Sequence, residues 1–236
     1  EKVFEAGPVF RAEPSFTTRH STEFTGYDFE LAYIDSHQDV ITEQEELLVA
    51  MMKAAKKNFG PAIAEHYSEE VVVPSRPFPQ VTMAEAKEML QAAGVKSDRT
   101  DDLSPEEERE LSRLIKERNN HEFVFVTDYP ATARPFYHMR YEDRPEITKS
   151  YDLLFRGLEI TTGAQREHRH DRLVAQAKEK GMDLDQLSFY INFFKYGCPP
   201  HGGLGMGPNR LLMRMFNLPS IREAMYVYRG PHRLVP

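Results

Sequence analysis

Strand-forming segments in this sequence follow one another in runs, separated by short turns rather than by regularly alternating helices. One run covers residues 3–10 and 25–34 around a polar loop at 14–22, and a second follows His121 as EFVFVTDYP, PFYHMRYED and ITKSYDLLFRGLEITTGAQR. Parallel strands need long crossover connections, so strands joined by short turns favour antiparallel pairing. We therefore expect the α+β class, with an antiparallel β-sheet flanked by helices.

Helix signals surround these strands. Three Ser/Thr-x-x-Glu pairs predict helix starts at Thr42–Glu45, Thr82–Glu85 and Ser104–Glu107. The last two lie in a segment, about residues 74–120, that is first proline-rich and then helical, so we expect a helical insertion there. Its acidic run EEERE is expected to be a solvated helix face. Further helical patterns cover 171–180, 184–195 and 210–216, and another starts at Ser220.

Composition excludes several classes. With 236 residues and 40% hydrophobic content, the chain can bury a sizeable core, and we expect one large domain. A net charge of −7 argues against a protein held to nucleic acid by its overall charge. The single cysteine, Cys198, excludes a disulfide framework and a CxxC metal site, and suits a reducing cytoplasm. No apolar run approaches the roughly 20 residues that span a bilayer, so we expect a cytoplasmic protein without a membrane partner.

The segment from Phe10 to Glu30 carries a density of mixed charge that a core cannot hold, because unpaired buried charges are costly. The planar guanidinium of arginine can donate two hydrogen bonds to phosphate oxygens, and an aromatic ring can stack on a base. A carboxylate can accept a hydrogen bond from the exocyclic amine of a base. These properties together suit a nucleotide. The candidate residues are Arg11, Glu13, Arg19, His20 and Phe24.

Two acids, Asp152 and Glu159, stand seven residues apart. On one uninterrupted strand this odd spacing would direct them to opposite faces of the sheet. Arg156-Gly157 between them is typical of a turn or bulge, which can bring both acids to one face of adjacent strands. Two such carboxylates suit Mg²⁺, which binds one or two protein carboxylates together with phosphate oxygens.

Two further groups lie downstream. Arg166 can clamp a carboxylate bidentately, and the nearby His168 and His170 lack the spacing of a zinc motif. The glycine-rich GLGMGPNR at 203–210 is not the GxGxxG of a dinucleotide fold, because no βαβ unit surrounds it. It nevertheless allows close backbone approach to a ligand, with Arg210 at the start of the following helix.

These segments together resemble a known family. FRAE with the TTRH loop resembles motif 2 of class II aminoacyl-tRNA synthetases, and GLGMGPNR resembles motif 3. The intervening SYDLLFRGLEITTGAQREHRHD and FKYGCPPHGG look like the aspartyl-tRNA synthetase branch in its archaeal and eukaryotic style. The resemblance implies an antiparallel sheet flanked by helices. It also implies activation of L-aspartate with ATP and Mg²⁺, followed by transfer to the 3′ end of tRNA(Asp), with tRNA(Asn) left open.

The resemblance assigns a role in ATP binding to the first group. Arg11 would bind the α-phosphate, Glu13 the adenine amine and His20 the γ-phosphate. Phe24 and Arg210 would sandwich the adenine ring. Arg11 and Arg210 are the expected catalytic residues, and the ATP-binding set also includes Arg19, Glu159 and Gly207.

The other residues would hold the amino acid and the metal. Arg166 would bind the side-chain carboxylate of aspartate, and Asp28 occupies a position where enzymes for aspartate carry Asp and enzymes for asparagine carry Glu. Thr162 would contribute to the aspartate site. The expected Mg²⁺ ligands are Asp152, Glu159 and Thr162.

The chain also departs from the pattern. The matched part begins just before motif 2, so residues 1–236 would be a partial catalytic domain without motif 1, which builds the homodimer of the family, or the anticodon-binding β-barrel. Asn209 stands where the family has an acid, and YVYRGPHRLVP replaces the usual FPRD. Two alternatives therefore stay open. One is a paralogue that makes asparagine from aspartyl-adenylate and ammonia, and the other is a non-catalytic nucleotide-binding or regulatory paralogue.

Overall fold

A single seven-stranded sheet organises the part of the chain that the computed structural model describes, residues 1–12, 14 and 16–235. The strands are β1 (Lys2–Phe10), β2 (Glu23–Ala32), β3 (Gln80–Thr82), β4 (Phe123–Thr127), β5 (Ser150–Phe155), β6 (Leu158–Gln165) and β7 (His201–Met206). Their order is β1-β2-β7-β6-β5-β4-β3. All neighbours pair antiparallel except β3 and β4, which run parallel. The expected antiparallel sheet is confirmed.

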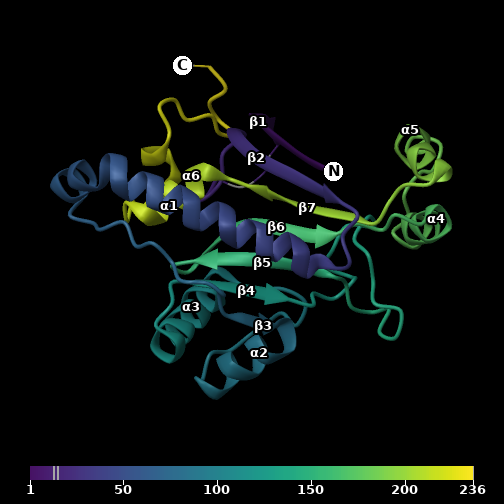
Figure 1. Ribbon diagram of the computed structural model, residues 1–236, viewed down its shortest axis with the longest axis horizontal. Helices are drawn as coiled ribbons and strands as arrows, with labels where there is room; N and C mark the ends of the chain where they lie inside the picture. The colour runs from purple at the N-terminus through teal and green to yellow at the C-terminus, as the bar shows by residue number, and fades with distance from the viewer. Residues whose placement is uncertain (13, 15, 236) are drawn as a thin grey trace.

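Helices flank this sheet, as expected for the α+β class. They are α1 (His37–Tyr67), α2 (Met83–Ala92), α3 (Pro105–Asn119), α4 (His170–Glu179), α5 (Ser188–Ile191) and α6 (Pro208–Met215), with 3₁₀ helices η1 (Asn192–Tyr196) and η2 (Ile221–Ala224). Figure 1 shows α1 lying across the sheet, α2 and α3 beside β3 and β4, and α4 and α5 standing away from it. Within the described residues, no helix has the length and apolar character needed to cross a membrane.

Alternation along the strands separates two cores. On β4, Phe123 and Phe125 pack with α1, whereas Val124 and Val126 pack with α2 and α3. Because successive side chains of a strand point to opposite faces, one strand serves both cores. The sheet is therefore covered by α1 on one face and partly by α2 and α3 on the other.

Helix starts agree with the capping boxes except at α1. Thr82 and Ser104 cap α2 and α3 as predicted, each accepting a backbone hydrogen bond from the Glu three residues later. The prediction of Thr42 as an N-cap is wrong, because α1 begins six residues earlier, where Ser36 and Asp39 form the capping box. Glu45 is instead buried and accepts from the backbone N–H of Phe78 at 2.8 Å.

Two other predicted segments differ in detail. PFYHMRYED forms no regular strand; it contributes only isolated bridges, His138 to Arg166 and Arg140 to Thr148, because turns interrupt it. Residues 74–120 contain α2 and α3, and they also contain β3, which joins the sheet by pairing with β4.

Candidate active site

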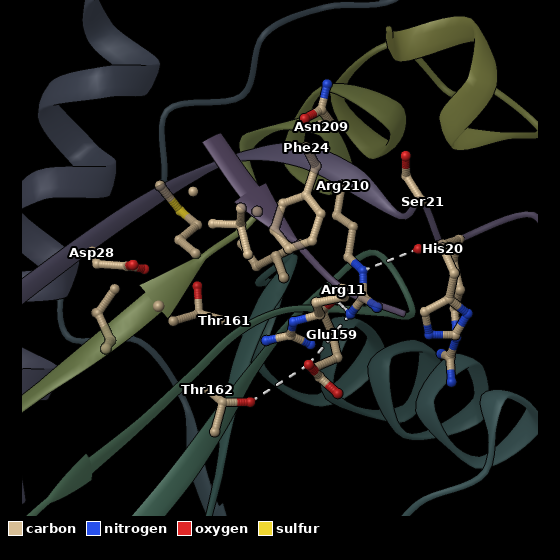
Figure 2. Close-up of a pocket in the computed structure, with 18 of the residues that line it drawn as sticks. Arg11, His20, Ser21, Phe24, Asp28, Glu159, Thr161, Thr162, Asn209 and Arg210 are labelled. Carbon is tan, nitrogen blue, oxygen red and sulfur yellow. Dashed lines mark hydrogen bonds and ion pairs between the residues drawn. The ribbon is translucent and has the colours of Figure 1, made fainter. Parts of the chain in front are cut away.

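A cavity of about 530 Å³ opens on the sheet face away from α1. On β7, Leu204 and Met206 belong to the core with α1, so the alternating Gly203 and Gly205 face the opposite side. A Cβ on Gly203 would lie 2.4 Å from Cδ of Glu30. The glycine-rich strand therefore leaves room for acidic side chains of β2. Figure 2 shows the pocket residues gathered over these strands.

The β5–β6 hairpin brings the two separated acids to the same face of the sheet. Asp152 pairs across the hairpin with Thr162, and Leu154 pairs with Glu159. Glu159 and Thr162 are three residues apart, which on a regular strand would put them on opposite faces. A bulge in the pairing shifts the register between them and aligns both with Asp152. The predicted turn at 156–157, with both residues at positive φ, is confirmed.

Electrostatics around these acids reflect their burial. Asp152 Oδ2 accepts from Arg134 Nη2 at 2.7 Å, and Asp152 Oδ1 is buried with no hydrogen-bond partner among the described residues. Burial, together with the nearby Asp152 carboxylate, raises the pKa of Glu159 above its ordinary value. Arg134 lines the cavity, and its guanidinium carbon lies 3.6 Å from the centre of the Tyr129 ring. Asp152 is not among the residues that line the cavity; it contacts Arg134.

Arg166, directly after the end of β6, contacts protein groups on two sides of its guanidinium. Its Nη2 and Nε donate to Glu30 Oε1 at 2.7 and 3.1 Å, and its Nη1 donates to His138 Nε2 at 3.3 Å. Burial and the Arg166 guanidinium keep the pKa of His138 well below its ordinary value, so the ring is neutral and accepts. Burial and the carboxylates of Glu5 and Glu30 raise the pKa of the neighbouring Asp28.

The loop between β1 and β2 lines the cavity with Arg19 and His20. His20 Nδ1 lies 2.6 Å from the Thr17 hydroxyl, and Arg19 Nη1 donates to both carboxylate oxygens of Glu108 at 2.9 and 2.8 Å. Arg11 and Phe24 flank this loop, with the Arg11 guanidinium 5.7 Å from the ring centre. Glu13 lies outside the described residues.

The start of α6 closes the cavity. Gly207 is its N-cap, and Arg210 in its first turn donates from Nη1 to the backbone carbonyl of Glu159 at 2.9 Å and to its Oε1 at 3.3 Å. Arg210 Nε also donates to the carbonyl of Arg19 at 3.3 Å. Residues from the two ends of the chain thus meet in one network (Figure 2).

The C-terminal segment supports this network through hydrogen bonds to backbone carbonyls. Asn209 donates to the carbonyl of Ala224 at 2.8 Å, which ties α6 to η2. Tyr228 donates from its hydroxyl to the carbonyl of His20 at 3.2 Å, and Ser21 Oγ donates to the carbonyl of Arg229 at 2.8 Å. This segment therefore braces the β1–β2 loop from outside.

The expectation of a solvated acidic run on α3 is confirmed for Glu106 and Arg109, which are exposed, but it is wrong for two glutamates of the run. Glu107 and Glu108 are only 1% and 4% exposed. The sequence contained a signal for this, because Glu108 precedes the buried Leu111 and Ile115 by three and seven residues and so shares their helix face. Burial raises the pKa of Glu108 even though the Arg19 guanidinium opposes the shift.

The sequence did not point to several residues at or beside the cavity, among them Glu30, Glu108, Arg134 and His138. Glu30 follows Asp28 by two residues on β2, so strand alternation alone would have brought it to the same face. Arg134 and His138 lie in irregular backbone between β4 and β5, where no periodicity predicts direction. Their positions follow only from the packing of that segment against β5 and β6.

Residues 1–228 match the family described as tRNA synthetases class II (D, K and N). Among curated proteins, the aspartate–tRNA(Asp) ligase of Pyrococcus abyssi is 42% identical over 236 residues, covering 100% of this chain and 54% of the relative. The aspartate–tRNA(Asp/Asn) ligase of Aeropyrum pernix is also 42% identical, over 238 residues, with the same coverage. The chain thus spans about half the length of the curated relatives it matches.

Solved structures agree with this match. The aspartyl-tRNA synthetase of Entamoeba histolytica has a TM-score of 0.94 at 40% identity, over 100% of this chain and 49% of its own. The asparaginyl-tRNA synthetase of Pyrococcus horikoshii, complexed with asparaginyl-adenylate, has a TM-score of 0.90 at 33% identity, over 100% and 54%. The fold is therefore shared with structures of both amino-acid specificities.

Proposed function

Because the chain belongs to the class II aminoacyl-tRNA synthetase family, we propose that the protein activates L-aspartate with ATP and transfers the aspartyl group to the 3′ end of tRNA. One observation carries this proposal: a single cavity is lined both by Arg11, His20 and Arg210, which suit a nucleotide, and by Arg166, which suits a carboxylate. Figure 2 shows Asp28 and His20 on different sides of this cavity.

The first step needs alignment more than proton transfer. The α-carboxylate of aspartate is ionised at pH 7, so one of its oxygens can attack the α-phosphorus of ATP without a general base. The bond from the α-phosphorus to the bridging oxygen breaks, and pyrophosphate leaves. Arg11 is assigned to the α-phosphate, where its cation would stabilise charge on the phosphoryl oxygens, and Phe24 and Arg210 to the adenine. A ribose hydroxyl of tRNA then attacks the carbonyl carbon, and AMP leaves.

The acids of the β5–β6 hairpin fit a divalent cation. Asp152 Oδ1 is a buried acceptor without a described partner. Burial, and after it the nearby Asp152 carboxylate, raises the pKa of Glu159, and a positive charge between the two carboxylates would be favourable. The described residues contain no cluster of three His, Cys, Asp or Glu side chains. Mg²⁺ binds one or two protein carboxylates together with phosphate oxygens, so the proposed ligands are Asp152 and Glu159 with the Thr162 hydroxyl. When bound, the cation would neutralise charge on the phosphates.

Aspartate is proposed over asparagine because Arg166 presents a cation at the amino-acid end. A guanidinium gains more from an ionised carboxylate than from a neutral amide. The names of the relatives from Pyrococcus abyssi and Aeropyrum pernix support aspartate, and they differ in the tRNA they specify. We propose tRNA(Asp) as the acceptor.

Exchange of labelled pyrophosphate into ATP tests the first step in the protein at its natural full length. We expect exchange that depends on aspartate and is at least tenfold slower with asparagine at the same concentration. Faster exchange with asparagine would contradict the choice of substrate. No exchange with either amino acid would contradict activation and favour a non-catalytic paralogue.

The second step is tested by charging purified tRNA(Asp) and tRNA(Asn) separately. We expect aspartyl transfer to tRNA(Asp). Transfer to both would show that the enzyme does not discriminate between the two tRNAs. Exchange without transfer to either, together with asparagine formed on adding ammonia, would refute the ligase and favour the asparagine-forming paralogue.

A further inference from the structure

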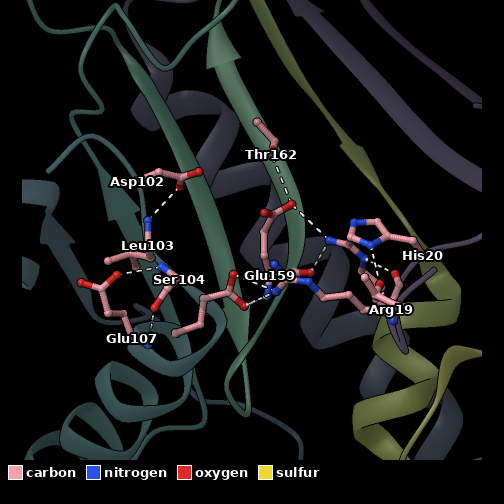
Figure 3. A network of polar contacts seen from close by, with 11 residues as sticks. Arg19, His20, Asp102, Leu103, Ser104, Glu107, Glu159 and Thr162 are labelled. Atoms are coloured by element: carbon pink, nitrogen blue, oxygen red, sulfur yellow. Dashed lines mark hydrogen bonds and ion pairs between the residues drawn. The ribbon is translucent and has the colours of Figure 1, made fainter. Parts of the chain in front are cut away.

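Glu108 on α3 has contacts that the reaction itself does not explain. Its side chain is 5% exposed and accepts from Arg19 Nη1 with both oxygens. Its Oε2 also lies 3.4 Å from the backbone nitrogen of Glu159, which donates to it. One buried carboxylate thus joins the β1–β2 loop to β6. Figure 3 shows Arg19, Glu159 and the first turn of α3 in this network.

The first turn of α3 is fixed in place independently of the cavity. Ser104 and Glu107 form its capping box, and Glu107 Oε1 accepts from Lys87 Nζ of α2 at 2.7 Å. At Gly157, which has a φ of +76°, a Cβ would lie 2.9 Å from Cα of Arg109. The helix therefore packs directly on the turn that leads into β6.

The contacts close into a ring of two ion pairs that are joined by two hydrogen bonds to backbone groups. Glu108 binds Arg19, the carbonyl of Arg19 accepts from Arg210, and Arg210 binds Glu159, whose backbone N–H returns to Glu108. Arg19, Arg210 and Glu159 all line the cavity, whereas Glu108 does not. Glu108 contacts two of these cavity residues, Arg19 and Glu159, and connects them to a helix outside the cavity.

We propose that Glu108 is a positioning residue of the nucleotide site, which holds Arg19 and the start of β6 in the arrangement that binds the triphosphate of ATP. This inference rests on the proposed function for the identity of the ligand. Without the carboxylate, the Arg19 guanidinium loses the buried anion that its Nη1 contacts, and the loop must be ordered when ATP binds. The free energy of that ordering reduces the affinity for ATP.

Glu108→Gln tests this in the full-length protein, with Glu107→Gln as the matched control. Both glutamates lie buried in the same helical turn, but Glu107 contacts Lys87 and the backbone of Ser104 rather than the loop. We expect the affinity for ATP, measured by calorimetry, to fall about tenfold in Glu108→Gln, since a neutral amide binds the Arg19 guanidinium more weakly than a carboxylate does. We expect the affinity for aspartate to change less than twofold, and Glu107→Gln to keep both.

Amide hydrogen exchange of residues 16–22 without ligands gives a second readout. We expect faster exchange in Glu108→Gln and wild-type exchange in Glu107→Gln. Glu108→Asp keeps the charge on a shorter side chain, so it should restore part of the ATP affinity and part of the slow exchange of the loop. If Glu108→Gln does not fold, Glu108→Asp replaces it in both measurements.

Three results would overturn the inference: tighter ATP binding by Glu108→Gln, wild-type loop exchange in that variant, or equal effects of Glu107→Gln and Glu108→Gln. If the wild-type protein itself bound no ATP, the proposed function would fail. Loop exchange would then still decide whether Glu108 orders Arg19.

Discussion

At the scale of single residues, charged side chains around the cavity are held in place by protein groups. Arg166 donates to Glu30 and to the neutral His138, and Asp152 accepts from Arg134. Such contacts limit the number of rotamers a long side chain can adopt, so less conformational entropy is lost when a ligand binds. The positions of the residues expected to contact substrate therefore depend on their hydrogen bonds to neighbouring protein groups.

Arg166→Ala should raise the KM for aspartate about 100-fold and the KM for ATP less than threefold. The reason is that a charge-assisted pair of hydrogen bonds contributes about 3 kcal/mol, and each 1.4 kcal/mol corresponds to a factor of ten. Pyrophosphate exchange at varied concentrations of each substrate measures the split. Arg172→Ala, an exposed arginine on α4, is the control and should change neither. Equal increases in both KM values would refute the assigned role of Arg166.

His37, the first residue of α1, should make the protein less stable in mild acid. Burial lowers its pKa from 6.5 to about 4. Above pH 6.5 the ring is neutral in both states, so nothing is lost. Between pH 6.5 and 4 the unfolded chain takes up a proton that the folded chain does not, which lowers the free energy of unfolding by about 1.4 kcal/mol per pH unit and roughly 3 kcal/mol in total.

Denaturant unfolding of the wild type and His37→Gln at pH 7, 5.5 and 4 measures this effect. The stability of the wild type relative to the variant should fall by roughly 3 kcal/mol over that range. A difference that stays constant with pH would contradict it.

At the scale of elements, the site depends on how secondary structures pack against its strands. The β5–β6 hairpin carries Asp152, Glu159 and Thr162, and α3 packs on its turn at Gly157. On the opposite side of the cavity, η2 and the segment after it brace the β1–β2 loop through Tyr228. The geometry of the cavity therefore depends on two supports that do not themselves bind ligand.

Gly157→Ala should destabilise the protein more than Gly181→Ala. Both glycines have positive φ, of +76° and +69°, which costs an L-residue about 1–2 kcal/mol. Only at Gly157 would the added Cβ clash with the backbone of Arg109, at 2.9 Å, whereas nothing lies within 4 Å at Gly181. We expect an additional loss of about 1–3 kcal/mol, the usual cost of overpacking. Equal losses in denaturant unfolding would show that the helix can move away from the turn.

At the scale of the whole molecule, the cavity combines segments that are far apart in sequence. Arg11 and Phe24 come from the first 24 residues of the chain, Glu159 and Arg166 from the β5–β6 region, and Arg210 from α6. A ligand that contacts all of these binds the folded chain and has no comparable site in the unfolded one. Binding should therefore stabilise the whole sheet rather than one part.

ATP at 100 times its Kd should raise the free energy of unfolding by about 2.7 kcal/mol. For a domain of this size this corresponds to an increase in Tm of roughly 5–10 °C. Calorimetry with ATP and Mg²⁺ measures the shift, and Arg210→Ala at the same ATP concentration should lose most of it. A transition that splits, with only part of it shifted by ATP, would contradict stabilisation of the whole sheet.

Local patterns in the sequence determined much of the fold and part of the site. Strands joined by short turns determined the antiparallel sheet, because strand connectivity limits pairing direction. The capping boxes at Thr82 and Ser104 determined two helix starts, since a cap depends on neighbours within one turn. The turn at Arg156-Gly157 likewise predicted that Asp152 and Glu159 share a face.

Tertiary structure alone decided the remainder, because it depends on contacts between distant residues. The bulge that aligns Thr162 with Glu159 is a property of two paired strands. Arg134 and His138 reach the site from irregular backbone, whose direction follows from packing rather than from periodicity. Glu108 was expected to be solvated, but Arg19, 89 residues away in sequence, provides the opposite charge that lets it be buried.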